Sequence, residues 1–288
     1  MWEEKIELHT MYDFDYTLYR LSYDPMISLQ RDERLVKIPV VFDGDYHIVT
    51  VQAIGTTAEP SFIVRSDSEE YKDQIISRIF DLFQWDRELE KIQSHFQQTN
   101  LDKLFRDYPA TPIVRDFDLY YCLMKTIIHQ QLNMKFAYVL TTRFIEQFGE
   151  QVDGVWFYPT PEKIANLQVE DLRKLQFSGR KAEYVIDTSK KIAAGELNLE
   201  ELKDKADEEV IKELVKIRGI GTWTAENWLL FGLGREDLFP KADIGIQNAV
   251  KQYFGLERKP TIEELEAFSS GWEPYRSFAS LTLWRSIE

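Results

Sequence analysis

Residues 214–225 have the sequence Leu-Val-Lys-Ile-Arg-Gly-Ile-Gly-Thr-Trp-Thr-Ala, in which two apolar helical patterns meet at Gly-Ile-Gly. Glycine permits backbone conformations and close approach that a side chain prevents. Such a turn exposes backbone N–H groups at a helix N-terminus, where hydrogen bonds and the helix dipole favour a phosphate oxygen. The stretch predicts two helices joined by a tight turn that is suited to bind phosphate through Gly219 and Gly221, with the Thr222 hydroxyl as a further donor.

A second informative stretch, Phe239-Pro240-Lys241-Ala242-Asp243-Ile244-Gly245, begins 18 residues after Gly221. Asp243 follows a loop proline and precedes an apolar-periodic helix, which is a common position for a helix N-cap. The Gly-Ile-Gly turn has an equally ordinary explanation, in which Gly219 ends one helix and Gly221 begins the next. From these residues alone, a structural and a chemical role remain open for both stretches.

The composition restricts how this protein could bind a polyanion. The chain has 288 residues and a formal net charge of −14, which argues against an extended basic surface. Residues 1–110 carry 12 basic and 21 acidic side chains (net −9), whereas residues 111–288 carry 23 and 28 (net −5). A nucleic-acid-binding face must therefore be local and must depend on backbone dipoles more than on lysine and arginine.

The remaining composition excludes several classes of site. The one cysteine, Cys122, rules out an internal disulfide and a cysteine-ligated metal centre within one chain. The four histidines have no metal-ligand spacing. The acidic start of the chain does not resemble a signal peptide, and no apolar run is long enough to span a bilayer. We therefore expect a cytoplasmic protein with no membrane contact, and we expect it to be a monomer.

The periodicity of apolar residues predicts an α+β protein with two parts. Residues 35–42 and 46–54 are β-branched runs around Asp43-Gly44-Asp45, and residues 5–8 and 61–65 add short strands. Helical spacing begins near residue 69 and dominates after Pro112, with a break near Asn133. We predict a small N-terminal domain with an antiparallel sheet, residues 1–110, and a larger all-helical domain, residues 111–288.

Taken together, the two stretches resemble the helix-hairpin-helix/Gly-Pro-Asp superfamily of DNA glycosylases, and within it the 3-methyladenine DNA glycosylase II family. The matching patterns are Gly-Ile-Gly-x-Trp-Thr-Ala and Phe-Pro-x-x-Asp-Ile-Gly. Three further blocks resemble the same family in the same order: Ile-Ile-His-Gln-Gln at 127–131, Phe-Ser-Gly-Arg-Lys-Ala at 177–182 and Tyr-Arg-Ser-Phe-Ala-Ser-Leu-Thr-Leu-Trp at 275–284. The resemblance covers most of residues 118–288.

This resemblance implies an enzyme that removes alkylated purines from damaged double-stranded DNA in base-excision repair. Such an enzyme rotates the nucleotide out of the stack, and a carboxylate then stabilises positive charge that develops on the sugar. The family's carboxylate corresponds to Asp243, and the residue that fills the vacated space in the duplex corresponds to Gln131. The base pocket corresponds to Trp223, Trp284 and Asn227, and the indole rings of the two tryptophans suit an electron-poor, often cationic base.

The resemblance also implies a reaction without a lyase step. Bifunctional relatives carry a lysine in the second helix of the hairpin that forms a Schiff base with the sugar. Trp223 occupies that position here and has no amine. Lys241, in the loop two residues before Asp243, is the one lysine that could reach the sugar instead. No cofactor is expected, except a monovalent cation on the backbone carbonyls of Val215, Ile217 and Ile220.

Three departures from the family pattern leave the range of damaged bases open. Asn227 stands where the best-known type has tyrosine, Arg20 where an aromatic residue is expected, and Gln131 where the entering residue is apolar. Alkylated purines remain the first expectation, with deaminated or oxidised bases as the alternative. A non-catalytic helix-hairpin-helix DNA-binding protein would explain Gly219 and Gly221, but not Asp243 together with two tryptophans. Release of free base from methylated DNA distinguishes these hypotheses.

Overall fold

The computed structural model describes residues 1–288, and its N-terminal part is built on an antiparallel sheet with the strand order β1-β5-β4-β3-β2. The strands are β1 (Trp2–Glu7), β2 (Leu29–Gln30), β3 (Leu35–Phe42), β4 (Asp45–Ala53) and β5 (Ser61–Ser66). Alternate residues of β3 are buried, and its partner β4 pairs in a register that places Val36 opposite Val51 and Ile38 opposite Val49. This alternation gives the sheet one apolar face.

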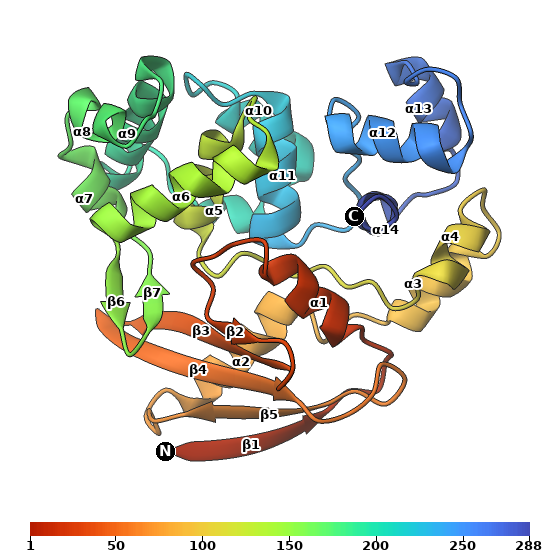
Figure 1. Cartoon of the computed structure of the whole chain (residues 1–288), viewed down its shortest axis with the longest axis horizontal. Helices are drawn as coiled ribbons and strands as arrows, with labels where there is room; N and C mark the ends of the chain where they lie inside the picture. The colour runs from red at the N-terminus through yellow and green to blue at the C-terminus, as the bar shows by residue number, and fades with distance from the viewer.

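Four helices belong to the same part of the chain: α1 (Phe14–Leu21), α2 (Lys72–Phe83), α3 (Leu89–Phe96) and α4 (Asp102–Asp107). In Figure 1, α1 lies between the sheet and the helices of the remaining chain, whereas α2 lies behind the strands. Aromatic rings join them to the sheet, since the ring of Phe14 lies 5.1 Å from that of Phe62 and 5.7 Å from that of Phe83. The sheet therefore supports α1, which in turn contacts the helical part.

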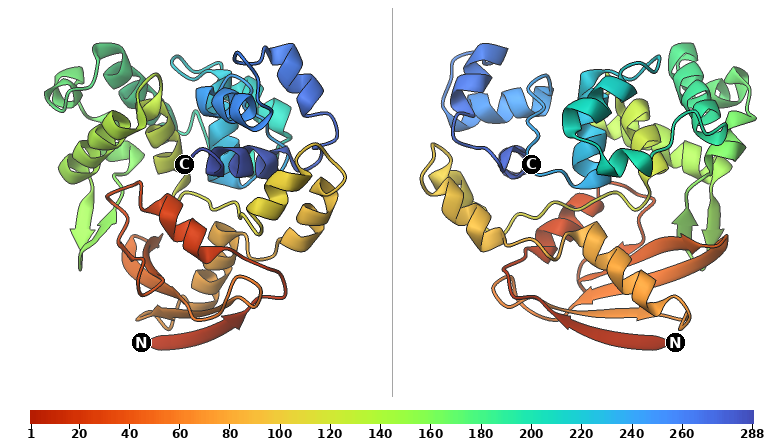
Figure 2. Two further views of the ribbon diagram at one scale, coloured as in Figure 1. Left: turned by 45° about the vertical axis from the view of Figure 1, so that its right-hand side comes forward. Right: turned by 180° about the vertical axis from the view of Figure 1, so that it is seen from behind.

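The remaining chain is mostly helical. It contains α5 (Leu119–His129), α6 (Met134–Phe148), α7 (Pro161–Ala165), α8 (Val169–Lys174), α9 (Gly179–Ala193), the 3₁₀ helix η1 (Glu201–Asp204), α10 (Asp207–Leu214), α11 (Thr222–Leu233), α12 (Ile244–Tyr253), α13 (Ile262–Phe268) and α14 (Arg276–Arg285). The last helix, α14, lies beneath α12, and the C-terminus ends near the centre of the molecule, close to α1 (Figure 2). Tyr16 of α1 donates a hydrogen bond to Glu288 at 3.0 Å.

The predicted α+β class, with a sheet-containing N-terminal part and a helical remainder, is confirmed. The structure differs from the sequence analysis in two places: α1 is a helix in a region where only strands were predicted, and a hairpin of β6 (Glu150–Val152) and β7 (Val155–Phe157) lies within the part predicted to be all-helical. Its turn is Asp153-Gly154, both with positive φ, a strong hairpin signal whose flanking strands are only three residues long. The hairpin reaches the N-terminal sheet, where the rings of Phe157 and Tyr46 lie 4.5 Å apart (Figure 1).

The core is continuous from the sheet to the helices, because buried apolar residues of both parts form one contiguous cluster. The segment that joins them includes Ile113 and Arg115, both buried. The division into domains at residues 110 and 111 stays a prediction. None of the helices combines the length and the apolar composition needed to cross a membrane.

Candidate active site

The two glycines of the hairpin between α10 and α11 have different surroundings. Gly219 has a φ of 93°, and a Cβ built there would lie 2.2 Å from the ring of Tyr184. It therefore needs to be glycine for its conformation and for the close approach of that ring. Gly221 has a φ of −101° and open space in front of its Cβ position. Glycine at 221 leaves room for a partner outside the chain.

The N-terminus of α11 has no side-chain cap. Gly221 occupies the N-cap position and Thr222 the first helical position, and both are exposed. The nearby guanidinium of Arg218 is engaged by Glu183 and, at 3.7 Å, by Asp187, while it stacks over Tyr184. The free N–H groups of the helix are therefore the main positive feature of this turn.

The predicted cation ligands lie in the same turn. Val215 is the C-cap of α10, and Ile217 and Ile220 are buried within the turn itself. The carbonyl of Ile217 already accepts a hydrogen bond of 3.0 Å from the N–H of Ile220. This bond closes the turn and brings the three carbonyl-bearing residues into one short loop.

The N-terminus of α12 is capped by Asp243. Its Oδ1 atom accepts hydrogen bonds from the backbone N–H of Ile246 at 3.0 Å and from Nε1 of Trp284 at 3.1 Å. Its Oδ2 atom accepts one from Nε1 of Trp223 at 2.8 Å. Asp243 is thus both a helix cap and a carboxylate oriented by two indole groups. The structural and the chemical explanations drawn from the sequence do not exclude each other.

Those two indoles come from distant parts of the chain, since Trp223 lies in the first turn of α11 and Trp284 near the end of α14. The backbone beside the carboxylate also limits what fits there. A Cβ on Gly245 would lie 2.8 Å from Nε1 of Trp284 and 2.9 Å from Oδ1 of Asp243. Gly245 therefore permits the approach of Trp284, a role that the sequence did not predict.

The structure brings Trp223 and Trp284 together at Asp243, whereas the third predicted pocket residue, Asn227, faces its own helix. Asn227 is buried, and its Nδ2 atom donates to the carbonyl of Trp223 at 2.8 Å. A residue that the sequence analysis missed, Phe231, stacks on Trp284 with 6.1 Å between the rings. The guanidinium of Arg20 lies over Phe231 at 5.5 Å. The aromatic surface beside Asp243 therefore extends from Trp284 to Phe231, where it meets the guanidinium of Arg20.

Gln131 lies in the loop between α5 and α6. Its side chain is exposed and its φ is 56°, in the left-handed region that non-glycine residues rarely adopt. It is not in contact with Asp243, and the loop is a separate feature of the same helical part.

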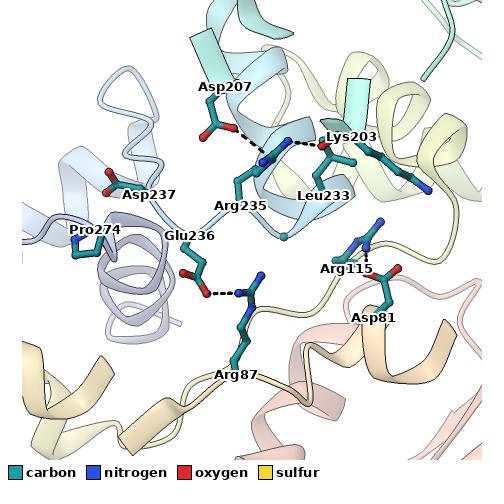
Figure 3. A pocket seen from close by; sticks show the side chains of 11 residues that line it. Asp81, Arg87, Arg115, Lys203, Asp207, Leu233, Arg235, Glu236, Asp237 and Pro274 are labelled. Carbon is teal, nitrogen blue, oxygen red and sulfur yellow. Dashed lines mark hydrogen bonds and ion pairs between the residues drawn. The ribbon is translucent and has the colours of Figure 1, made fainter. Parts of the chain in front are cut away.

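A cleft of about 530 Å³ lies at the other end of α11, and none of the predicted site residues lines it. Its charged side chains all form ion pairs, and Figure 3 shows two of these, Arg87 with Glu236 and Arg235 with Asp207. Asp81 likewise pairs with Arg115. The acidic and basic side chains of this cleft balance, and neither the hairpin nor Asp243 lines it, so we do not assign it to the site.

Comparison with known proteins identifies the fold of this chain and the superfamily to which it belongs. The fold is that of the solved 3-methyladenine DNA glycosylase of Archaeoglobus fulgidus, with a TM-score of 0.86, 23% identity, and 99% and 97% of the two chains covered. Schizosaccharomyces pombe 3-methyladenine DNA glycosylase, solved in complex with abasic DNA, is 29% identical, with a TM-score of 0.62 over 68% of this chain and 96% of that one. YfjP of Bacillus subtilis (strain 168), provisionally named a DNA-3-methyladenine glycosylase, is 52% identical over the full length of both chains. The family model of the HhH-GPD superfamily base excision DNA repair proteins matches residues 124–274, and the chain belongs to that superfamily.

Proposed function

We propose that this protein is a monofunctional DNA glycosylase that hydrolyses the N-glycosidic bond of alkylated purines in double-stranded DNA, and that it acts as a monomer. The observation that carries the proposal is the carboxylate of Asp243, oriented by Trp223 and Trp284 on the helix that follows the hairpin. Membership of a base-excision family and the names of the two 3-methyladenine glycosylases among its relatives support the substrate class.

Asp243 has the contacts required of an electrostatic catalyst. A carboxylate has about four acceptor positions, and the three donors occupy two on Oδ1 and one on Oδ2. Oδ2 therefore keeps an open position, which suits it to face the sugar of a nucleotide rotated out of the duplex, or to orient the attacking water. Because the donors already fix the carboxylate, little reorganisation is needed when positive charge develops on the sugar.

The aromatic surface beside Asp243 suits an alkylated base. Alkylation of a ring nitrogen makes a purine electron-poor and often cationic, and an aromatic face attracts such a ring by stacking and by a cation–π interaction of roughly 0.5–2 kcal/mol. Trp284 and Phe231 provide adjoining rings, and Trp223 flanks the carboxylate on its other side. The N-glycosidic bond to such a base is also weaker, so the enzyme needs to lower the activation barrier by less.

The second candidate substrate is a neutral base with a carbonyl group, such as a deaminated purine, and Arg20 is the observation that favours it. Its Nη1 atom is buried without a hydrogen-bond partner, and its only ion pair is with Glu288 at 3.7 Å. A guanidinium next to the stacked rings repels a cationic base and offers a donor to a carbonyl oxygen.

The hairpin supplies the DNA contact in this proposal. The uncapped N–H groups at Gly221 and Thr222 bind a phosphate of the backbone, and a monovalent cation on the carbonyls of Val215, Ile217 and Ile220 neutralises part of its charge. Gln131 fills the space left by the rotated nucleotide. This arrangement explains how a chain of net charge −14 binds DNA without a broad basic surface.

The proposal that there is no lyase step depends on the lack of a free lysine amine beside Asp243. Trp223 offers no amine, and the ammonium of Lys241 pairs with Glu266 at 2.7 Å. Borohydride reduction during turnover tests this, because it converts any imine into a covalent protein–DNA adduct. We expect no adduct and an intact abasic strand; an adduct that disappears in Lys241→Ala would contradict the monofunctional proposal.

The proposed function is tested by measuring release of free base from duplexes that each carry one alkylated, deaminated or oxidised base. We expect release of alkylated purines, and none by Asp243→Asn in the same time. If deaminated purines are released faster, the second candidate is correct. DNA binding without release of any base would favour a non-catalytic binding protein.

A further inference from the structure

The loop that carries Gln131 is tied to the hairpin by its neighbour, Gln130. The Nε2 atom of Gln130 donates to the carbonyl of Gly219 at 2.8 Å and to the hydroxyl of Thr224 at 2.7 Å. Gly219 lies in the hairpin turn, and Thr224 is buried in the first turn of α11. Both N–H groups of the Gln130 amide therefore donate to the hairpin, one to each side of the phosphate-binding turn.

The same loop is fixed from its other side by Lys181. The Nζ atom of this residue donates to the carbonyls of Ile127 (3.3 Å), Ile128 and Gln130 (2.8 Å) at the C-terminal end of α5. These are carbonyls that a helix end leaves without an intrahelical partner. Partial burial lowers the pKa of Lys181 to about 8.

The position of Lys181 is unusual for a lysine. It is in the first turn of α9, where the positive end of the helix dipole disfavours a cation. The C-terminal end of α5 offsets this cost, because its carbonyls carry the opposite partial charge. The lysine thus joins the start of one helix to the end of another at the point where the Gln131 loop begins.

We propose that Gln130 is a positioning residue that, together with Lys181, holds Gln131 at a fixed offset from the hairpin. Binding of a phosphate at Gly221 then presents Gln131 to the duplex at a set distance, without a separate ordering step. The left-handed backbone of Gln131 costs on the order of 1 kcal/mol, and the two tethers are what maintain it before DNA arrives. This inference rests on the proposed function, since it assumes that the protein opens a duplex.

A purely structural role is the competing explanation, because buried carbonyls need donors in any protein. The two explanations differ in which substrates they affect. Loss of fold support lowers the rate on every substrate equally. Loss of positioning lowers the rate most where the stack must be opened, and least where a mismatch has already weakened the pairing around the lesion.

The test compares Gln130→Met with the parent enzyme in single-turnover base release at saturating protein. Methionine keeps the length of the side chain and removes both donors. We expect about a tenfold loss of rate on a fully paired duplex, as for one or two lost hydrogen bonds, and less than about twofold when the lesion faces a mismatched base. Gln52→Met is the matched control, because Gln52 also donates to a backbone carbonyl but lies on β4.

A second measurement asks whether Gln130 acts through Gln131. If it does, adding Gln130→Met to Gln131→Ala causes no further loss, whereas independent roles give additive losses and overturn the proposal. An equal loss on paired and mismatched duplexes also overturns it. Should Gln130→Met unfold, Thr224→Val removes one acceptor without changing side-chain shape, and the same substrate dependence is expected on a smaller scale. Failure of the parent enzyme to release any base refutes the proposed function instead, so the two failures are distinguishable.

Discussion

Two helix N-termini close together in the chain, those of α11 and α12, are built in opposite ways. At α11 the N-cap is Gly221, which has no side chain and faces open space. At α12 the N-cap is Asp243, whose carboxylate accepts the N–H of Ile246 and is bonded by two indoles as well. Both ends carry the partial positive charge of a helix dipole. The first is left for an anion from outside, and the second is filled by an anion of the protein.

This difference separates the two tasks of the proposed reaction. An uncapped helix end binds a phosphate without regard to base sequence, which suits a contact that only anchors the DNA. A capped end fixes a carboxylate in one orientation, which suits the stabilisation of a cationic sugar. Substitutions at the two ends should therefore have effects of different kinds, and this makes the comparison testable.

The largest effect is expected from Asp243→Asn. Asparagine is as good an N-cap as aspartate, so the cap on Ile246 should remain, while the negative charge beside the sugar and the acceptor of the Trp223 indole are lost. Single-turnover base release should fall by ~10²–10³, and binding of lesion-containing DNA should remain. Asp118→Asn is a matched control, because Asp118 caps α5 by accepting the N–H of Tyr121. Base release by Asp243→Asn at the parental rate would show that the carboxylate is not catalytic.

The next effect is expected on folding, from Gly219→Ala. The φ of 93° and the contact with Tyr184 both oppose a side chain, and the free energy of unfolding should fall by about 2 kcal/mol or more. Urea unfolding measures this directly. If Gly219→Ala is as stable as the parent, the hairpin is more adaptable than its geometry indicates.

Gly221→Val should change binding more than folding. Its backbone is in the extended region that valine favours, so stability should stay within about 1 kcal/mol of the parent. The side chain would fill the open space in front of α11 and weaken binding to undamaged duplex by about tenfold, whatever its sequence. Unchanged affinity in the folded Gly221→Val protein would remove the hairpin from the DNA contact.

The sequence predicted the elements of this comparison better than their contacts. Helices at 222–233 and 244–253, with Asp243 before the second, follow from apolar periodicity and cap chemistry. The family resemblance placed Trp284 in the base pocket, but its hydrogen bond to Asp243 was not predicted, because 41 residues separate the two and no local pattern joins them. Contacts such as those of Phe231 and Gln130 depend on the packing of distant helices, which periodicity within one helix does not specify.

The smallest effect concerns Glu226, a half-buried acid on α11 whose carboxyl interacts with the charge of Lys241 in the loop leading to α12. Burial raises the pKa of Glu226 from 4.5 to about 7, and Lys241 offsets this only partly. A carboxyl whose pKa is higher in the folded protein stabilises the fold fully below pH 4.5, and this contribution is lost as the pH rises through 7. Glu226→Gln removes the titration, so its stability relative to the parent should improve between pH 5.5 and pH 8 by on the order of 1 kcal/mol, allowing for partial exposure. Urea unfolding of both proteins at the two pH values measures this difference. Parallel pH profiles would mean that Glu226 is solvated, and that the space between the two helix ends is open to water.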